Sequence, residues 1–261
     1  MIYYIDKTLE NDFLKVKLND PFFCKIKALY NAYSCDNNGI NFFIQYNTNK
    51  EITAAVSKID STAICYINSN TNFEELSQFL IVLGISKVTC YKKYINQFNF
   101  QESQFGSIMK LDSLKPHQKS IDNRFKLRIP STKDLLDFLC ENFYDNKFDK
   151  LNYEKTYVDL SHRIRHGSAE CLAIFHNEKL VSSAMIISKT DNTAVLGCIA
   201  TSKCYRKNGF ASYLMSKLLT DNCRFIDDIY LFRENGKNKN FYLNLGFKDI
   251  DEWTEIYNLN N

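Results

Sequence analysis

Apolar residues recur along the first half of the chain with two different spacings, which predict an alternation of helices and strands. The spacing of about 3.6 residues that is typical of amphipathic helices covers 21–34 and 73–83. Short alternating or continuous apolar runs indicate strands. The predicted strands are 41–46, 52–59, 61–68 and 87–90.

The second half shows the same two spacings. Ser131 precedes an apolar helical pattern and Asp134 follows three residues later, so a helix with a capped start is predicted at 131–144. The other predicted helices are 153–165, 209–219 and 237–245. The predicted strands are 170–175, 180–188, 193–201 and 228–233, with final strands within 247–257.

A polar stretch, 112–124, separates these two halves and resembles a linker. A chain of 261 residues is long enough for two compact domains, so we expect one at 1–118 and one at 119–261. Both halves show a helix, three successive strands, a helix and a strand. The predicted class is α+β, and a structural duplication is our hypothesis.

Composition and charge limit the classes of protein and partner that this sequence favours. Hydrophobic residues make up 45% and charged residues 24%, which is typical of a folded protein. The net charge of +3 includes no block of like charge, so we expect no nucleic-acid partner. The start is not typical of a secretory signal, and the longest apolar run, 79–85, is too short for a membrane span. We expect a cytoplasmic protein.

Nine cysteines are scattered singly, without a C-x-x-C pair. They are interpreted as reduced thiols, and no metal site is expected from them. His162 and His166 share one helix face at a spacing that suits a metal. No Glu or Cys ligand accompanies them, so a solvated basic face is the preferred interpretation.

The most informative segment is a strand followed by a polar loop and a helix. The strand at 193–201 leads into a loop with Arg206, Gly209 and Ala211. A helix N-terminus presents unpaired N–H groups and a positive dipole end, and small residues let the backbone approach a phosphate closely. Further positive charge comes from Lys203 and Lys207. The pattern R-x-x-G-x-A occurs by chance, however, so an ordinary helix start with a solvated basic loop stays open.

A second segment favours the phosphate site. After the strand at 228–233, Asn235 is followed by Tyr242 in a short helix and then by Gly246 and Phe247. In order and spacing, the two segments together resemble the GNAT superfamily of N-acetyltransferases. The resemblance covers about Leu127 to Tyr257 and implies two GNAT-like domains, each with a mixed, mostly antiparallel sheet flanked by helices.

The resemblance also implies a reaction and its residues. An acetyl or short acyl group would pass from acetyl-CoA, as co-substrate, to a primary amine by direct attack in a ternary complex without a metal. Tyr242 would donate a proton to the departing thiolate. The residues implied in cofactor binding are Ile199, Ala200, Thr201, Arg206, Lys207, Asn208, Gly209, Phe210, Ala211 and Asn235.

The general base is unassigned. Tyr230 stands where some family members have a glutamate, and Glu170 and Glu234 are the remaining candidates. Cys198 lies on the proposed cofactor strand, but it is interpreted as a buried thiol because nothing indicates a lowered pKa. No motif of a hydrolase or of a covalent acyl-enzyme is present.

Other functions stay open. The first half has no R-x-x-G-x-G loop, and we interpret it as a degenerate GNAT-like half that no longer binds the cofactor and shapes the acceptor site or braces the other half. A catalytically weak CoA-sensing or protein-interaction module on the same fold is the alternative, and a structural subunit is a third. The acceptor is a small molecule, an aminoacyl conjugate or a protein N-terminus, and the protein is a monomer or homodimer.

Overall fold

The protein divides into two compact units that do not follow each other simply along the chain. The structure, a computed structural model, describes residues 1–35, 39–98, 100–115, 121–143 and 152–257. The first unit comprises Met1–Met109, Phe232–Lys237 and Asp249–Asn261, and the second comprises Lys110–Leu231 and Asn238–Lys248. The linear division at 118/119 falls outside the described residues and stays a prediction.

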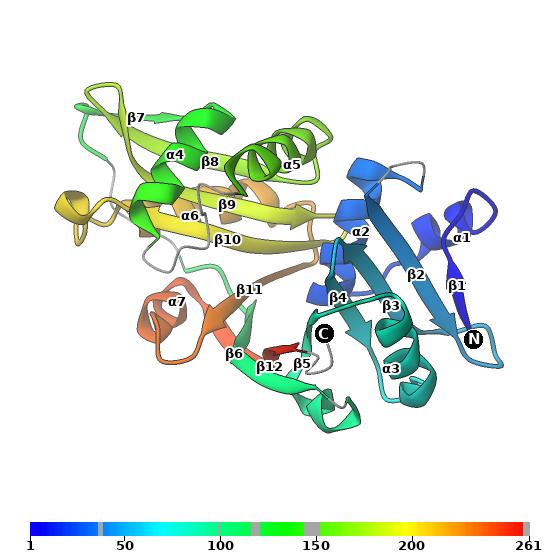
Figure 1. Cartoon of the computed structure of the whole chain (residues 1–261). Helices are drawn as coiled ribbons and strands as arrows, with labels where there is room; N and C mark the ends of the chain where they lie inside the picture. Colours follow the sequence, from blue (N-terminus) through cyan, green and yellow to red (C-terminus); the bar gives the residue numbers. More distant parts are fainter. Residues whose placement is uncertain (36–38, 99, 116–120, 144–151, 258–261) are drawn as a thin grey trace. The chain divides into compact units, whose positions relative to one another are not determined.

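The first unit contains the start of the chain and consists of a sheet with helices packed against it (Figure 1). Its elements in chain order are β1 Ile2–Tyr4, α1 Glu10–Lys15, α2 Pro21–Tyr33, β2 Ile40–Tyr46, β3 Ile52–Ile59, β4 Thr62–Ile67, α3 Phe73–Val82, β5 Lys87–Tyr91, the 3-10 helix η1 Lys92–Gln97 and most of β6 Gln101–Leu111.

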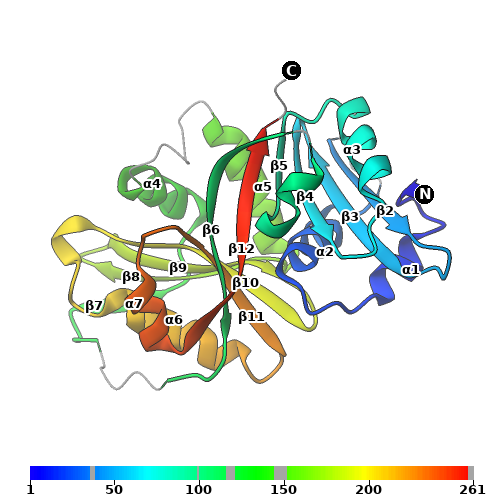
Figure 2. The same cartoon turned by 90° about the horizontal axis from the view of Figure 1, so that it is seen from below.

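Strands β1 to β4 pair antiparallel in chain order, and β4 pairs parallel with β5. The next neighbour of β5 is β12 (Phe247–Tyr257), the last strand of the chain, which pairs antiparallel from Trp253 onward. Phe42 contacts Tyr30 of α2 and Phe43 contacts Phe79 of α3, at 5.1 and 4.9 Å between ring centroids. Since successive strand residues point to opposite faces, α2 and α3 cover opposite faces of this sheet (Figure 2).

The second unit repeats the arrangement. Its elements in chain order are β7 Phe125–Arg128, α4 Thr132–Asn142, α5 Tyr153–Arg165, β8 Glu170–His176, β9 Lys179–Lys189, β10 Thr193–Thr201, the 3-10 helix η3 Lys203–Tyr205, α6 Phe210–Asn222, most of β11 Asp228–Glu234, α7 Lys239–Leu245 and the start of β12.

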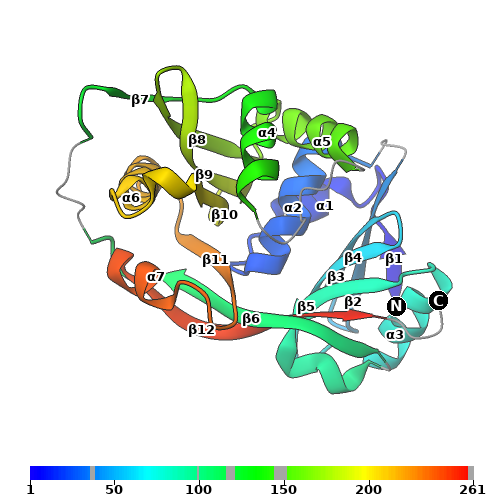
Figure 3. The same ribbon diagram turned by 60° about the vertical axis from the view of Figure 1, so that its left-hand side comes forward.

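Strands β7 to β10 pair antiparallel in chain order, and β10 pairs parallel with β11. Leucines of α4 and α5, including Leu135 and Leu160, form one cluster with Cys171 and Met185 of the sheet. Helix α6 packs against β8, β9 and β10 from the other side, as Figure 3 shows. Both units are therefore mixed, mostly antiparallel sheets flanked by helices, and the predicted α+β class is confirmed.

The predicted helices and strands are confirmed within a few residues, apart from residue 144, which lies outside the described residues. The expected final strands at 247–257 are wrong, because these residues form one strand, β12. The pattern missed β1 and β7, which are too short for a period to show, and β6, whose first residues are polar. Among the described residues, no helix is long and apolar enough to cross a membrane.

Gly246 illustrates why the Leu-Gly-Phe sequence is needed. It ends α7 in the left-handed region, with φ +100°, and its carbonyl accepts a hydrogen bond from the N–H of Asp112 at 3.0 Å. A Cβ at this position would lie 1.8 Å from the carbonyl oxygen of Ser113. Both the backbone conformation and the space therefore require glycine.

Replacing Gly246 with Ala is expected to lower the free energy of unfolding by about 3 kcal/mol, since it adds a steric clash to an unfavourable φ. Gly236→Ala is the matched control. Gly236 also has a positive φ, +73°, but a Cβ there would have nothing within 4 Å. We expect a loss of only about 1 kcal/mol there. Denaturant unfolding of both variants is the measurement, and equal losses would contradict the steric argument.

Candidate cofactor-binding site

Strand β10 changes its pairing halfway along its length. Its parallel register with β11 ends at the pair Leu196–Leu231. Its antiparallel register with β9 continues, but it shifts between Gly197 and Ala200. Cys198, within the shift, has φ +50°, which an ordinary strand residue does not adopt. The strand therefore contains a β-bulge.

The bulge leaves a stretch of backbone that suits an extended ligand. Residues 197–201 are all half-exposed, whereas 193–196 are buried. Backbone N–H and C=O groups on the side of β10 away from β9 have no β11 partner in the register beyond Leu196. A linear molecule with amide groups can add to such an edge as a strand does. Ile199, Ala200 and Thr201, the predicted contacts of the pantetheine arm, lie in this stretch.

The loop after β10 leads to an uncapped helix start. Gly209 is the N-cap of α6 with φ +83°, and it has no side chain to satisfy the first N–H groups. The first turn contains no acidic residue. Exposed Arg206 donates through Nε to the carbonyl of Thr201 at 3.0 Å, and Asn208 donates to the carbonyl of Tyr205 at 3.0 Å. The predicted loop residues thus surround a helix N-terminus that favours an anion.

The residues predicted in this loop divide into two kinds. Arg206, Lys207 and Asn208 are exposed and can face a ligand with their side chains. Phe210 is buried, and its ring lies 4.6 Å from that of Phe125 on β7. Its side chain anchors α6, so only its backbone is left for a phosphate. Ala211 is small and half-exposed, as a close approach of phosphate requires.

Sequence reasoning missed an aromatic brace beneath the loop. Nδ1 of His176, on β8, lies 2.8 Å from the hydroxyl of Tyr205 in η3. The ring of Phe125 lies 4.8 Å from His176 and 6.3 Å from Tyr205. These contacts tie the loop to β7 and β8. No motif signals them, because the three residues come from separate segments.

Two buried serines on β9 were also missed. Ser182 donates to the carbonyl of Ala200 at 3.1 Å and shares a hydrogen bond with the hydroxyl of Thr201 at 2.8 Å. Ser183 donates to the carbonyl of Cys198 at 3.4 Å. Both serines therefore contact the bulged stretch of β10.

Tyr242 lies on α7, which packs against α6 within the second unit. The residue is half-buried, and its ring lies 5.0 Å from Phe241 and 6.3 Å from Phe247. Asn235 is exposed, belongs to the first unit, and donates through its backbone N–H to the carbonyl of Phe105 at 3.4 Å. The roles of Tyr242 and Asn235 both stay predictions.

The candidate bases are engaged in ion pairs. Glu170 lies 3.1 Å from Nζ of Lys189, and Glu234 pairs with Lys237. Neither carboxylate is therefore assigned as the general base.

Tyr230, the residue expected where some family members have a glutamate, is buried on β11. Tyr230 donates to Oδ2 of Asp228 at 3.1 Å, and Oδ1 of Asp228 lies 2.6 Å from Nζ of Lys110. Asp228 is therefore the third carboxylate of this group that is paired with a lysine, and Tyr230 is one of its hydrogen-bond donors.

The histidine pair is a stacked surface feature. The rings of His162 and His166 lie 4.0 Å apart, and Nδ1 of His166 is 2.9 Å from the carbonyl of His162. In the described part of the chain, no three His, Cys, Asp or Glu side chains are grouped to hold a metal. All nine cysteines are free thiols. Cys198 is half-exposed rather than buried, and it packs against the α4/α5 cluster.

The matching positions of the first unit look different. At the start of α3, Asn72 accepts a hydrogen bond from the N–H of Glu75, and its own N–H donates to the side chain of Gln45. The first turn also contains the acidic Glu74 and Glu75. The β3–β4 register runs unbroken from Ala54–Ile67 to Ile59–Thr62. This helix start is therefore capped, acidic and preceded by a strand without a bulge.

Aromatic rings gather where β4 and β5 stop pairing. The β4–β5 register ends at Ile64–Thr89, and the ring of Tyr91, at the end of β5, lies 4.6 Å from Phe22 of α2. The Tyr91 hydroxyl donates to the carboxylate of Asp20, which also caps α2. Burial raises the pKa of Asp20, although the hydrogen bonds from Tyr91 and from two backbone N–H groups act in the opposite direction.

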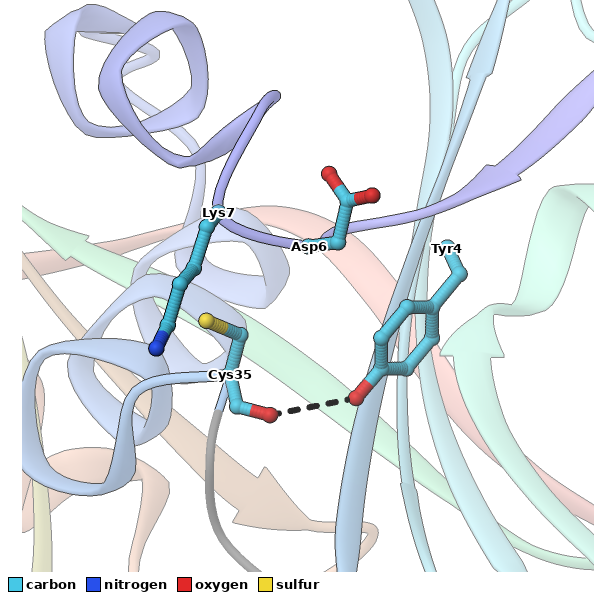
Figure 4. A pocket seen from close by; sticks show the side chains of 4 residues that line it. All are labelled: Tyr4, Asp6, Lys7 and Cys35. Carbon is cyan, nitrogen blue, oxygen red and sulfur yellow. Dashed lines mark hydrogen bonds between the residues drawn. The ribbon is translucent and has the colours of Figure 1, made fainter.

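A pocket elsewhere in the first unit shares no residue with these sites. It is lined by Tyr4, Asp6, Lys7 and Cys35, and the Tyr4 hydroxyl donates to the carbonyl of Cys35 at 3.2 Å (Figure 4). The carboxylate of Asp6 accepts hydrogen bonds from the hydroxyl and N–H of Thr8. These bonds lower the pKa of Asp6.

Comparisons with known proteins agree with this geometry. Residues 132–247 match the model of the acetyltransferase (GNAT) family. A tandem GNAT protein from the clavulanic acid biosynthesis pathway is similar over 98% of this chain and 97% of its own, with a TM-score of 0.62 and 9% identity. A Drosophila protein is similar over 100% of this chain and 99% of its own, with a TM-score of 0.72 and 10% identity.

A GNAT-family acetyltransferase from Colwellia psychrerythraea is similar over 99% of this chain and 100% of its own, with a TM-score of 0.54 and 15% identity. No curated protein matches the sequence. Residues 132–247 are therefore similar to the acetyltransferase (GNAT) family. Over its whole length it has the tandem GNAT-like fold, with two GNAT-like units of which the second contains the bulged strand and the uncapped helix.

The raised pKa of Asp20 predicts a pH dependence of stability. A carboxyl whose pKa is raised by folding stabilises the protein fully below its unfolded pKa, and this contribution is lost as pH rises through the folded pKa. Asp20→Asn keeps a capping oxygen and removes the titration. We therefore expect the variant to gain stability relative to the wild type as pH rises from about 4 towards neutrality.

Asp6→Asn is the control of opposite sign. Because folding lowers the pKa of Asp6, its contribution is present above the unfolded pKa and lost as pH falls through the folded pKa. This variant should lose stability relative to the wild type as pH rises from about 2 to about 4, and the difference should change little above that. Urea unfolding of the three proteins at several pH values is the measurement, and parallel pH profiles for both variants would refute the assignment.

Proposed function

We propose that this protein transfers an acetyl or other short acyl group from acetyl-CoA to a primary amine, by direct attack in a ternary complex. The observation that carries the proposal is the bulged end of β10, residues 197–201, which leads into the uncapped start of α6 at Gly209. The bulged strand end suits the amide-containing arm of the cofactor, and the uncapped helix start suits its pyrophosphate. The GNAT-family match over 132–247 supports the same combination.

In the proposed reaction, a neutral amine attacks the thioester carbonyl. The carbonyl oxygen gains negative charge, and a backbone N–H within 198–200 serves as its hydrogen-bond donor. The C–S bond then breaks, and the thiolate takes a proton from the hydroxyl of Tyr242. The nitrogen of the new amide releases its extra proton to water, and Tyr242 takes a proton back from water. Holding both substrates in the reacting geometry supplies much of the acceleration. Asn235 contacts the cofactor arm in this proposal.

We further propose that the first unit does not bind the cofactor. Three observations support this: the side chains of Asn72 and Gln45 occupy the start of α3, its first turn is acidic, and β4 follows an unbroken register. Glu74 and Glu75 would repel a pyrophosphate. The unit would then shape the acceptor site or brace the catalytic unit.

A second function, a CoA-sensing or protein-interaction module with weak or no turnover, is favoured by one observation. The carboxylates of Glu170, Glu234 and Asp228 are each paired with a lysine. Release of free CoA thiol from acetyl-CoA over a panel of primary amines separates the two functions. Amine-dependent release supports the transferase, and cofactor binding without release supports the module.

Two exposed cysteines of the second unit allow a direct test of cofactor binding. Cys204 lies in η3, two residues before Arg206, and Cys223 follows the last turn of α6. Saturating acetyl-CoA should slow alkylation of Cys204, because the bound pyrophosphate covers the loop. Alkylation of Cys223 should keep its own rate, which burial already slows by raising its pKa.

Alkylation is followed for each cysteine by mass spectrometry, and each rate is compared with the rate of the same cysteine without ligand. An unchanged Cys204 rate at saturating acetyl-CoA, or equal slowing at both cysteines, would count against the loop as the binding site.

Replacing Tyr242 with Phe tests the general acid. Removing a positioned acid typically costs about 10²–10⁴-fold in rate, so we expect kcat to fall by roughly a hundredfold or more while the Kd for acetyl-CoA stays unchanged. Tyr3→Phe, an exposed tyrosine of the first unit, is the control and should keep full turnover. An unchanged kcat for Tyr242→Phe would remove this residue from the mechanism.

A further inference from the structure

Two neighbouring serines lie fully buried beside the bulge of β10. Ser182 and Ser183 on β9 each have 0% of their surface exposed. A buried hydroxyl costs free energy unless it is hydrogen-bonded, so its partners show why it is tolerated. Here the partners of both hydroxyls are Cys198, Ala200 and Thr201.

The bulge explains why these hydroxyls are needed. Where a strand carries extra residues, the ladder is interrupted and some backbone groups lose their cross-strand partners. The two serine hydroxyls donate to the carbonyls of Cys198 and Ala200, which both lie within the free stretch 197–201. Fixing the carbonyl of a peptide unit also fixes the direction of its N–H, because the peptide bond is planar.

The bonds continue towards the cofactor loop. Ser182 also pairs with the hydroxyl of Thr201, and the carbonyl of Thr201 accepts a hydrogen bond from Nε of Arg206. A chain of hydrogen bonds therefore runs from β9 through the end of β10 to the loop before α6.

The first unit supplies an internal comparison. Ser57 lies on β3, which pairs with β4 as β9 pairs with β10, and only 1% of its surface is exposed. Its hydroxyl has no hydrogen-bond partner among the described residues. The strand beside it has no bulge. In the second unit, β9 has serine hydrogen bonds and β10 has a bulge. In the first unit, Ser57 of β3 makes no such bond and β4 has no bulge.

We propose that Ser182 and Ser183 are positioning residues that hold the backbone of 198–201 so that its N–H and C=O groups face the pantetheine arm and the acyl group. This inference rests on the proposed binding of acetyl-CoA. The serines act through the backbone of β10, and they are not placed in contact with the reacting atoms.

The test compares two ligands. Ser182→Ala and Ser183→Ala, made separately, should each weaken binding of acetyl-CoA by roughly three- to tenfold, the usual effect of losing one hydrogen bond. Binding of the nucleotide portion of CoA, without its pantetheine arm, should change much less. A general loss of structure would instead weaken both ligands alike. Titration calorimetry gives both values of Kd.

Two further variants sharpen the result. Ser182→Thr keeps a hydroxyl and should restore most of the selective loss seen with Ala. Ser57→Ala is the matched control, since it removes a buried strand hydroxyl that has no partner, and it should leave both affinities unchanged. If Ser182→Ala and Ser183→Ala keep the wild-type ratio of the two affinities, the positioning role is overturned.

Failure of the proposed function has a different signature. If the wild type does not bind acetyl-CoA, the cofactor proposal fails. Hydrogen exchange without ligand then tests separately whether the two serines restrain the backbone of 198–201. A peptide that covers 197–201 should exchange its amide hydrogens faster in Ser182→Ala and Ser183→Ala than in the wild type and in Ser57→Ala. This result would support the hydrogen bonds of the two serines as restraints on β10. Equal exchange overturns them.

Discussion

The interrupted pairing of β10 is the feature on which the candidate site depends. A strand in the middle of a sheet has both edges satisfied and cannot bind a ligand through its backbone. Here the parallel pairing ends at Leu196, and the positive φ of Cys198 changes the direction of the strand while β9 still holds its other edge. The ligand edge is therefore free but fixed. The loop at Arg206 and the uncapped Gly209 follow within a few residues, so one continuous segment would serve both the arm and the phosphates of the proposed cofactor.

The two units show how similar folds can differ in chemistry. Both place a parallel strand pair beside a helix that begins just after the first strand. In the first unit, side-chain oxygens of Asn72 and Gln45 already accept the hydrogen bonds that an anion would accept. In the second unit, glycine leaves those donors open and lysine and arginine supply the charge. A few residues at the helix start decide between a structural cap and an anion site.

Periodicity predicted most of this fold, because long helices and buried strands impose a pattern on the sequence. It failed for β1 and β7, which have three and four residues, and it gave no sign that β12 pairs with β5, since strand neighbours are set by tertiary packing. The loop from Arg206 to Ala211 and Gly246 were found because each needs a particular residue at a fixed spacing. Ser182 and Ser183 lie in an apolar strand run, and only their hydrogen bonds distinguish them.

The charge pairs of the site region bear on how the proposed reaction would proceed. Asp228 holds Lys110 and the Tyr230 hydroxyl, Glu170 holds Lys189, and Glu234 holds Lys237. Each of these carboxylates is therefore engaged by a cation, and none is assigned as the base that takes the proton of the amine. The pair of Asp228 with Lys110 also joins β11 to β6 within the second unit. Backbone direction at 198–201 and the placing of two substrates would then contribute more to the rate than proton transfer from the amine.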